Sequence, residues 1–584
     1  MKEFFKKNKY EFISVCALLV LTTLFLYNFM QLWRADINVP FSYFCGDDMS
    51  ILANAKAMIE QGWNMTADRL GAPYVADYYN FSTSVLHNVD LVTLKVFTMI
   101  TKDAAMSANL VYLSVVYICA LVSYFVMREC KLTNWIAVGG SLVFAFSPFI
   151  FIRGIVHIVL TTCYFVPLSI LLCIWIYERD DVFAWNKNFF KNPRNYFAIL
   201  FTFLIANNGI AYYPFFTCFI LLVTGISKLI KTRKFNYLGK AFAMIGSIVA
   251  FMMVAMIPIF IHLAKYGKDA DELVRAGFSD SELYGLKIIQ LLLPVNGHGS
   301  YTLTKLINDY AEQAPLVNEN ISSYIGFMGI AGFAILLVVL FIKKKSALYE
   351  RLYLLSELNL GMVLLGTIGG FGSIFALFIS DMIRGYNRIS IFIEYVCILA
   401  FCMVLNHLYK KAAFRRKIVI IAAGCLFTAF VIYEQFPYEY VPAYEYCDSR
   451  YTSDEHFVQQ IEDSVDEGSM IYQLPYHQYP EGGSENDMSD YSLYTGYIHS
   501  KTLRWSYGTM RGSEGDKWNE KVSAMDLEDM VQYLKESGFA GIYIDRRAYE
   551  EDDLKALEAH LTEIIGAEPI VSENENLSFF NFTN

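Results

Sequence analysis

The stretch Phe44-Cys45-Gly46-Asp47-Asp48-Met49 decides how the fold of this 584-residue chain is interpreted. It follows the first long apolar segment, residues 11–33, by about ten residues, so two adjacent carboxylates stand just outside a membrane. Charged groups beside a bilayer are costly to desolvate, so they are expected to have a function. Downstream, residues 51–62 place apolar side chains on one face of a short helix. We therefore expect a folded loop that begins with an acidic pair.

Two interpretations of this pair are compatible with the sequence. In the first, Asp47 is the N-cap of the short helix and Asp48 lies in its first turn, where the helix dipole favours negative charge. In the second, one of the two carboxylates is a general base that faces a membrane-embedded cleft. A helix terminus would fix the position of such a base. Asp77, about thirty residues further on, is a third acid in the same loop and a candidate substrate contact.

The composition predicts an integral membrane protein. Hydrophobic residues make up 55% of the chain, charged residues 18%, and the mean hydropathy is +0.35. Residues 435–584 carry 30 acidic and 10 basic residues, whereas the rest carries 27 acidic and 37 basic residues. This change of sign predicts a transmembrane domain over 1–434 and a soluble domain over 435–584. Nothing in the sequence indicates binding to nucleic acid.

Eleven apolar segments are expected to span the membrane as helices. They are 11–33, 107–127, 135–151, 157–177, 195–206, 211–230, 240–263, 323–342, 353–380, 386–408 and 417–434.

Alternate connections between these segments are strongly basic, which predicts that they face the cytoplasm. They contain Arg128 and Lys131, Lys187 with Lys191 and Arg194, Lys228 to Lys234, Lys343 to Lys345, and Lys410 to Lys417. Lysines 2, 6, 7 and 9 precede the first segment and predict a cytoplasmic N-terminus. The first loop (34–106), the second long loop (264–322), the turn 380–388 and the C-terminal domain would then share the external face.

The C-terminal region alternates short apolar strands with helices, which is typical of a small α/β domain. Strands are predicted at 469–474 and 541–545, and helices at 526–537 and 551–565.

Arg384 and Arg388 flank a Gly-Tyr-Asn turn at the external end of an apolar segment. Guanidinium groups present paired donors in a fixed fork, so the two arginines, with Asn387 between them, are a candidate phosphate clamp. The alternative is that both arginines only extend to the membrane interface. The scarcity of cations elsewhere on this face favours the clamp.

Four other residues are weaker candidates for substrate binding. Arg153 and His157 are four residues apart and would share a helical face, either as a structural pair or as a phosphate ligand with a proton shuttle. His298 and Glu319, in the second long loop, are candidate substrate contacts. No glycine-rich loop of the nucleotide-binding types occurs, so an activated donor would have to be carried by a lipid.

The pattern resembles the GT-C superfamily of polyprenyl-phosphate-dependent glycosyltransferases, in which the first external loop begins with an acidic pair, matched here by Asp47 and Asp48. Several stretches also resemble bacterial membrane proteins of the YfhO-like or "sugar translocase" kind. They are Gly71-Ala72-Pro73, Arg153 with His157, the Leu-Leu-Pro before His298, Ile383-Arg384-Gly385-Tyr386-Asn387-Arg388-Ile389-Ser390, Gln473-Leu474-Pro475-Tyr476, and Arg504-Trp505-Ser506-Tyr507-Gly508.

The resemblance implies an inverting glycosyltransferase in a bacterial cytoplasmic membrane. Its donor would be a polyprenyl-phosphate-linked sugar and its acceptor a glycan or lipid of the cell envelope. Asp47 or Asp48 would be the base, and the arginines would stabilise the leaving phosphate. Mg²⁺ or Mn²⁺ could be held by the acidic pair with Asp77 or Glu319, although many members of the superfamily are thought to need no metal, so the metal is left unassigned.

Two alternatives remain open. A flippase for a lipid-linked glycan would use the same arginines without a base, although the sequence shows none of the repeated halves that many transporters have. A non-catalytic protein whose tail recruits partners is the other alternative.

Overall fold

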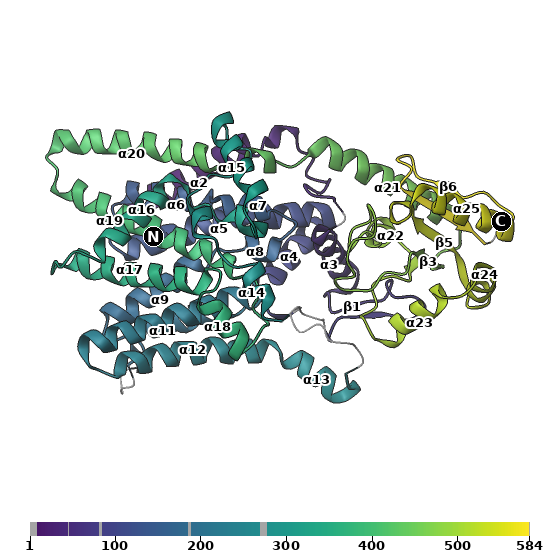
Figure 1. Ribbon diagram of the computed structural model, residues 1–584, viewed down its shortest axis with the longest axis horizontal. Coiled ribbons are helices and arrows are strands. Elements are labelled where there is room, and N and C mark those ends of the chain that lie inside the picture. Colours follow the sequence, from purple (N-terminus) through teal and green to yellow (C-terminus); the bar gives the residue numbers. More distant parts are fainter. Residues whose placement is uncertain (1–8, 45, 81–84, 185–188, 269–276, 583–584) are drawn as a thin grey trace.

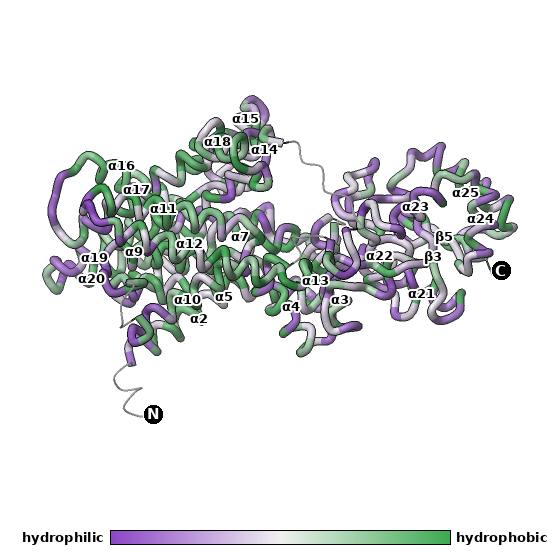
Figure 2. The backbone as a smooth tube through the Cα atoms, turned by 90° about the horizontal axis from the view of Figure 1, so that it is seen from below, coloured by the Kyte–Doolittle hydropathy of each residue, from purple (hydrophilic) through white to green (hydrophobic). Residues whose placement is uncertain are grey.

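The computed structural model describes residues 9–44, 46–80, 85–184, 189–268 and 277–582. Lys2, Lys6, Lys7, Cys45 and Lys187, which entered the sequence predictions, lie outside the described residues. The protein is elongated, with a helical bundle at one end of the long axis and an α/β domain at the other (Figure 1). Apolar residues predominate along the bundle, whereas the α/β domain is largely polar (Figure 2). The chain is therefore a multi-pass α-helical membrane protein with a C-terminal α/β domain.

Eight helical segments among the described residues are long and apolar enough to cross a membrane. They are α2 (Lys9–Phe29), α5 (Ala104–Glu129), α6 with α7 (Asn134–Ala145, Pro148–Arg153), α8 with α9 (Ile158–Thr161, Val166–Glu178), α11 (Tyr212–Thr232), α12 (Asn236–Ala255), η6 with α19 (Tyr386–Ile389, Ser390–Lys411) and α20 (Phe414–Gln435).

The other three predicted segments also form helices, but they differ in length or charge. The helices α10 (Pro193–Ala206) and α16 (Gly326–Val339) have 14 residues each, so each is about 21 Å long, short of a full hydrocarbon layer. Helix α17 (Ala347–Gly366) has 20 residues but includes three charged side chains, Glu350, Arg351 and Glu357. The predicted segment 353–380 is broken after Gly366, so that α17 is followed by a separate helix at 371–378. Each of the eleven apolar segments contains helix, and the number that crosses the membrane stays a prediction.

Helix α19 lies at the centre of the bundle. Every residue from Ser390 to Ala400 is buried, and the helix packs against α6, α9, α16 and α17. The mostly apolar sequence of α19 explains this position, because a helix that is hydrophobic on all sides must be surrounded by other helices.

The first loop is folded, as predicted. It contains α3 (Asp47–Gln61), β1 (Thr66–Ala67), β2 (Ala76–Asp77) and α4 (Asn88–Thr101). The predicted amphipathic helix is α3, which begins four residues earlier than 51. Helix α4 was not predicted. Its start is anchored to the break after α10, because Val89 N donates to Asn207 O at 3.1 Å and Asn88 Nδ2 to Asn207 Oδ1 at 3.1 Å.

The second long loop contributes short helices to the same end of the bundle. They are α14 (Ser279–Leu283), η4 (Ile288–Leu291), α15 (Tyr301–Gln313) and η5 (Asn318–Ser323), and α18 (Phe371–Phe378) lies against α14. Helix α13 (Ile257–Tyr266) follows α12 within the predicted segment 240–263 and extends into the start of this loop.

The C-terminal domain is a five-stranded sheet of order β4-β3-β5-β7-β6 with helices around it. Strand β3 is parallel to β4 and β5, whereas β7 is antiparallel to β5 and β6. The elements are α21 (Tyr444–Ser464), β3 (Met470–Leu474), α22 (Tyr494–His499), β4 (Arg504–Trp505), α23 (Glu514–Ser523), α24 (Leu527–Glu536), β5 (Phe539–Asp545), α25 (Glu551–Ile565), β6 (Ile570–Val571) and β7 (Leu577–Asn581). The two predicted strands and two predicted helices are confirmed.

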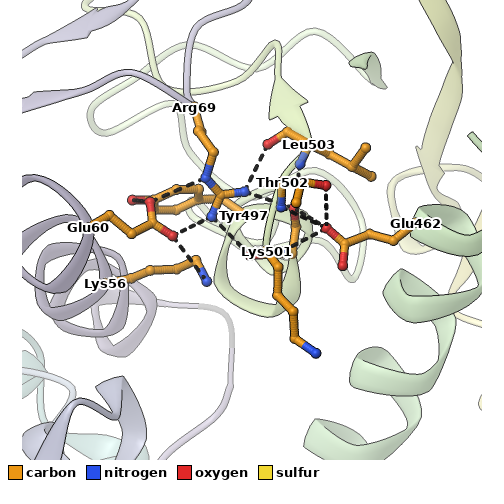
Figure 3. A network of polar contacts seen from close by, with 9 residues as sticks. Lys56, Glu60, Arg69, Glu462, Tyr497, Lys501, Thr502 and Leu503 are labelled. Atoms are coloured by element: carbon orange, nitrogen blue, oxygen red, sulfur yellow. Dashed lines mark hydrogen bonds and ion pairs between the residues drawn. The ribbon is translucent and has the colours of Figure 1, made fainter. Parts of the chain in front are cut away.

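A polar network joins the C-terminal domain to α3 (Figure 3). Arg69 forms an ion pair with Glu60 at the end of α3, and its guanidinium donates to Ser500 Oγ, Ser500 O and Leu503 O, each at 2.9 Å. Tyr497 OH donates to Glu60 Oε2 at 3.1 Å. The C-terminal domain therefore holds the end of α3 that lies farthest from Asp47.

Candidate functional site

The acidic pair lies at the start of α3, but Asp47 is the first helical residue and not the N-cap. The N-cap is Gly46, which makes no side-chain cap bond, and Asp47 and Asp48 are both in the first helical turn. The prediction that Asp47 is the N-cap is therefore wrong. Both carboxylates still lie in the favourable field of the helix N-terminus.

Asp48 is fully buried and has a structural environment. Its Oδ2 accepts hydrogen bonds from Ser42 Oγ and Phe44 N, both at 2.7 Å. Burial raises the pKa of Asp48, against the opposing effect of these two hydrogen bonds. The bonds fix the backbone that leads into α3, so Asp48 positions the start of the helix.

Asp47, by contrast, is open to solvent. Its side chain is 51% exposed, and its Oδ2 lies 3.2 Å from Nδ1 of His157, which is 38% exposed. His157 directly precedes α8, and its backbone N–H donates to Arg153 O, at the end of α7, at 3.0 Å. His157 therefore contacts both the exposed carboxylate of Asp47 and the backbone of the buried Arg153.

The two arginines Arg153 and Arg388 meet at one carboxylate. Arg153 Nη2 lies 2.9 Å from Glu319 Oε2, and Arg388 Nη2 lies 3.2 Å from Glu319 Oε1. Arg153 is 3% exposed and Arg388 is 9% exposed, and the Arg388 guanidinium lies 4.3 Å from the ring centroid of Tyr212. Burial disfavours the charge on Glu319, but the two guanidinium groups outweigh it and lower the pKa of Glu319 to about 2.

The predicted clamp of Arg384 and Arg388 is arranged differently from the expectation. Arg384 lies over the ring of Tyr284, 5.6 Å from its centroid, whereas Arg388 shares Glu319 with Arg153. Asn387, which lies between the two arginines in the sequence, is buried. Neither polar atom of its side chain has a hydrogen-bond partner among the described residues. Its backbone N–H donates to Tyr284 O at 3.0 Å.

Two other candidates have partners away from this cluster. Asp77 Oδ2 lies 3.5 Å from Nε2 of His262 on α13. His298 Nδ1 accepts a bond from Ser300 N at 2.9 Å, and His298 Nε2 lies 3.9 Å from Glu434 Oε1 at the end of α20. The described contacts link neither residue to Asp47 or to the arginines.

The residues suggested for a metal do not gather into a ligand set. Among the described residues, no group of three His, Cys, Asp or Glu side chains is arranged to hold a metal ion. The Oδ2 atom of Asp48 is occupied by its hydrogen bonds, Asp77 contacts His262 and Glu319 contacts two arginines. We therefore derive no step through a metal.

Tyrosines of the C-terminal domain lie near Asp47, and the sequence did not single them out as part of the site. Tyr479 packs against Tyr491 and Tyr78, with ring centroids 6.0 and 5.3 Å apart. Burial and the negative charge of Asp47 raise the pKa of Tyr479 to about 12. The same charge acts on Tyr491. The density of tyrosines in 472–507 was the only signal available.

Comparison with known proteins gives the fold its class. No protein-family model and no curated protein matches the chain. ArnT from Cupriavidus metallidurans bound to undecaprenyl phosphate is similar over 98% of both chains, with a TM-score of 0.50 and 12% identity. ArnT in the apo state has a TM-score of 0.52 and 11% identity over 96% of this chain and 97% of ArnT.

A more distant likeness is to the oligosaccharyltransferase of Archaeoglobus fulgidus tethered with an acceptor peptide. Its TM-score is 0.45 and its identity 12%, over 99% of this chain and 74% of that one. The ArnT comparisons show that the chain shares its overall fold with ArnT.

Proposed function

We propose that the protein is a membrane glycosyltransferase whose donor is a polyprenyl-phosphate-linked sugar. The observation that carries the proposal is one continuous set of contacts. The solvent-accessible Asp47 contacts His157, the backbone of His157 bonds to that of Arg153, and Arg153 shares the carboxylate of Glu319 with the buried Arg388. A base and a cationic site for a leaving phosphate are what transfer from a lipid phosphate needs. The fold it shares with ArnT, which was solved with undecaprenyl phosphate, supports this donor class.

In the proposed reaction, Asp47 accepts the proton of an acceptor hydroxyl. The hydroxyl oxygen attacks the anomeric carbon, a new carbon–oxygen bond forms, and the bond from that carbon to the phosphate oxygen breaks. Attack opposite the leaving group inverts the anomeric configuration. The electron pair leaves with the polyprenyl phosphate, whose charge Arg153 and Arg388 stabilise.

The histidine has a supporting role. His157 Nδ1 lies at hydrogen-bond distance from Asp47 Oδ2, so it orients the carboxylate and can take over the proton after the transfer. Asp48 keeps the start of α3 in place through Ser42 and Phe44.

The counter-charge for the arginines in the described structure is Glu319. With a pKa of about 2 it carries a negative charge at neutral pH. A donor phosphate competes with this carboxylate for the same two guanidinium groups. We assign Arg384 and Asn387, which follow one another closely in the 384–388 turn, to the edge of the phosphate site.

The acceptor approaches from the side of the C-terminal domain. The charge of Asp47 contributes to the raised pKa of both Tyr479 and Tyr491. Tyrosine rings can pack against the apolar faces of sugars. We propose a glycan or lipid of the cell envelope as acceptor. The basic helix connections lie at the other end of the bundle, which supports an active site on the external face of a bacterial cytoplasmic membrane.

The test is sugar transfer by the purified full-length protein from a radiolabelled polyprenyl-phosphate donor. Asp47→Asn should lower the rate by roughly 10²–10⁴-fold, because general base catalysis contributes about that much. Asp68→Asn, in the exposed part of the same loop, is the control and should transfer at the wild-type rate. Transfer at the wild-type rate by Asp47→Asn would rule out this mechanism. Movement of a lipid-linked glycan without transfer would support the flippase alternative instead.

A further inference from the structure

A second site lies at the end of the bundle away from Asp47. A cavity of about 500 Å³ opens between the α5–α6 connection, the ends of α9, α11 and α19, and the start of α17. We name it the basic cavity, after the cations in its wall: Lys131, Lys228, Arg351 and Lys410. Its volume falls within the range of about 300–1,000 Å³ that is usual for small-molecule sites.

The length of α19 separates the basic cavity from the candidate active site. Arg388 lies just before the start of α19, and Lys410 is next to its last residue. The 22 residues of α19 extend about 33 Å. A ligand in this cavity is therefore not a substrate bound at Asp47.

The cations of the basic cavity outnumber its carboxylates. Arg351 is occupied, because its Nη2 lies 2.7 Å from Glu178 Oε2 and its Nη1 donates to Cys130 O at 2.8 Å. Glu350 is the other carboxylate in the wall. Three ammonium groups are left, and none has a carboxylate within 4.0 Å among the residues that the structure describes.

Two of these three lysines make side-chain contacts at the cavity, and neither contact is with a carboxylate. Lys410 Nζ donates to the backbone oxygen of Lys131 at 3.1 Å. Lys228 Nζ lies 4.1 Å from the ring centroid of Tyr177. Like charges that gather around a concave surface repel one another, and an anion in the cavity removes this cost.

The preference of basic residues for the cytoplasmic side explains why lysines occur at this end, but it does not explain the cavity. Lys343, Lys344 and Lys345 lie at the same end and are exposed without lining it. Apolar side chains of Leu132, Leu348 and Met403 complete the wall. A cationic pocket with apolar walls, at the ends of membrane helices, fits a phosphate headgroup that carries acyl chains.

We propose that the basic cavity binds the phosphate headgroup of an anionic membrane lipid. Lys131, Lys228 and Lys410 supply the charge, and the apolar wall accepts the first part of the lipid tails. The proposal is independent of the transferase function, because it concerns a different end of the molecule.

The experiment is native mass spectrometry of the purified full-length protein titrated with phosphatidylglycerol, with phosphatidylcholine as the zwitterionic comparison. The wild type should retain phosphatidylglycerol more tightly than phosphatidylcholine. The triple variant Lys131→Gln, Lys228→Gln, Lys410→Gln should bind it at least tenfold more weakly. Its thermal unfolding without lipid should match that of the wild type, which verifies the fold.

The matched control is Lys343→Gln, Lys344→Gln, Lys345→Gln, which removes the same charge from the same end. It should bind phosphatidylglycerol as the wild type does. Equal losses in the two triple variants would overturn the proposal, because they would mean general attraction to a basic surface. In a parallel arm, inorganic phosphate should neither displace the lipid nor shift the unfolding temperature. If it does both, the lipid assignment is wrong.

Discussion

The two ends of the helix bundle handle positive charge in opposite ways. At the end that carries the C-terminal domain, Arg153 and Arg388 are buried and share the carboxylate of Glu319. In the basic cavity, Lys131 and Lys410 are exposed and no described carboxylate pairs with them. A buried cation needs a built-in partner, whereas an exposed one relies on water and ions. An anion at the first site must compete with Glu319, but at the second it displaces only solvent.

The largest effect should come from removing a cation at the first end. Arg388→Gln should lower the rate of sugar transfer by roughly 10²–10³-fold, as the loss of one preorganised donor does in other enzymes. Arg388→Lys should not restore it, because a single ammonium cannot reproduce the two-pronged guanidinium. Lys410→Gln, at the other end, should stay within about twofold. Comparable losses in the two glutamine variants would mean that the ends are not functionally distinct.

Glu319→Gln removes the carboxylate that pairs with Arg153 and Arg388, so that these two cations lack a carboxylate partner, as the lysines of the basic cavity do among the described residues. At neutral pH the variant should lose about 3 kcal/mol of unfolding free energy, because two buried cations lose their partner. The pKa of Glu319 is lowered from 4.5 to about 2, so its stabilisation is complete above pH 4.5 and is lost as the pH falls through about 2.

Unfolding curves of the wild type and Glu319→Gln at several pH values provide the measurement. The difference between them should narrow by about 1.4 kcal/mol for each pH unit between these two values. A difference that stays constant down to pH 2 would contradict the charge pairing.

A smaller effect is expected where the C-terminal domain holds α3. Arg69→Met removes the ion pair with Glu60 and leaves the oxygens of Ser500 and Leu503 without their donor. Each unsatisfied group costs about 1–3 kcal/mol, so the unfolding temperature and the transfer rate should both fall. The control is Lys517→Met, at an exposed residue of the C-terminal domain. Phosphatidylglycerol binding in the basic cavity should be unchanged, and its loss would show that the two ends are coupled.

The smallest effect should follow Asp48→Asn. A single oxygen of Asp48 accepts both the Ser42 and the Phe44 bonds, and an amide oxygen can do the same. The variant should transfer sugar within about threefold of wild type, whereas Asp48→Ala should lose about 1–3 kcal/mol of stability. A rate loss in Asp48→Asn as large as in Asp47→Asn, in a folded protein, would assign the base to Asp48 instead.

Local signals in the sequence were enough for most of the fold. Each of the eleven apolar segments contains helix, because apolar length is a property of the segment itself. Segment 353–380 differs from the prediction in forming two helices. Helix α4 escaped prediction because Asp90 and Lys95 interrupt its apolar run. Its polar contacts come from far along the chain, as in the bond from Asn208 Nδ2 to Asp90 Oδ1 at 3.1 Å. Such a helix is defined by its neighbours and not by its own composition.

The sequence identified the individual residues of the candidate site but not which of them contact one another. Asp47, Arg153, Glu319 and Arg388 were each singled out, yet their contacts join positions 69 to 166 residues apart. A single sequence contains no signal for such pairings. The pairing of Arg388 with Arg153 through Glu319, and the nearness of Tyr479 to Asp47, needed the three-dimensional structure.

The contacts of Arg69 that hold the far end of α3 depend on residues made late in synthesis of the chain. Arg69 makes its hydrogen bonds with residues 431 and 434 positions later in the chain. While the ribosome is still making the bundle, the helix that carries Asp47 has no partner to hold its far end. If the protein is the proposed transferase, we expect the nascent chain to gain activity only after residue 503 has been synthesised and the α/β domain has folded against the loop.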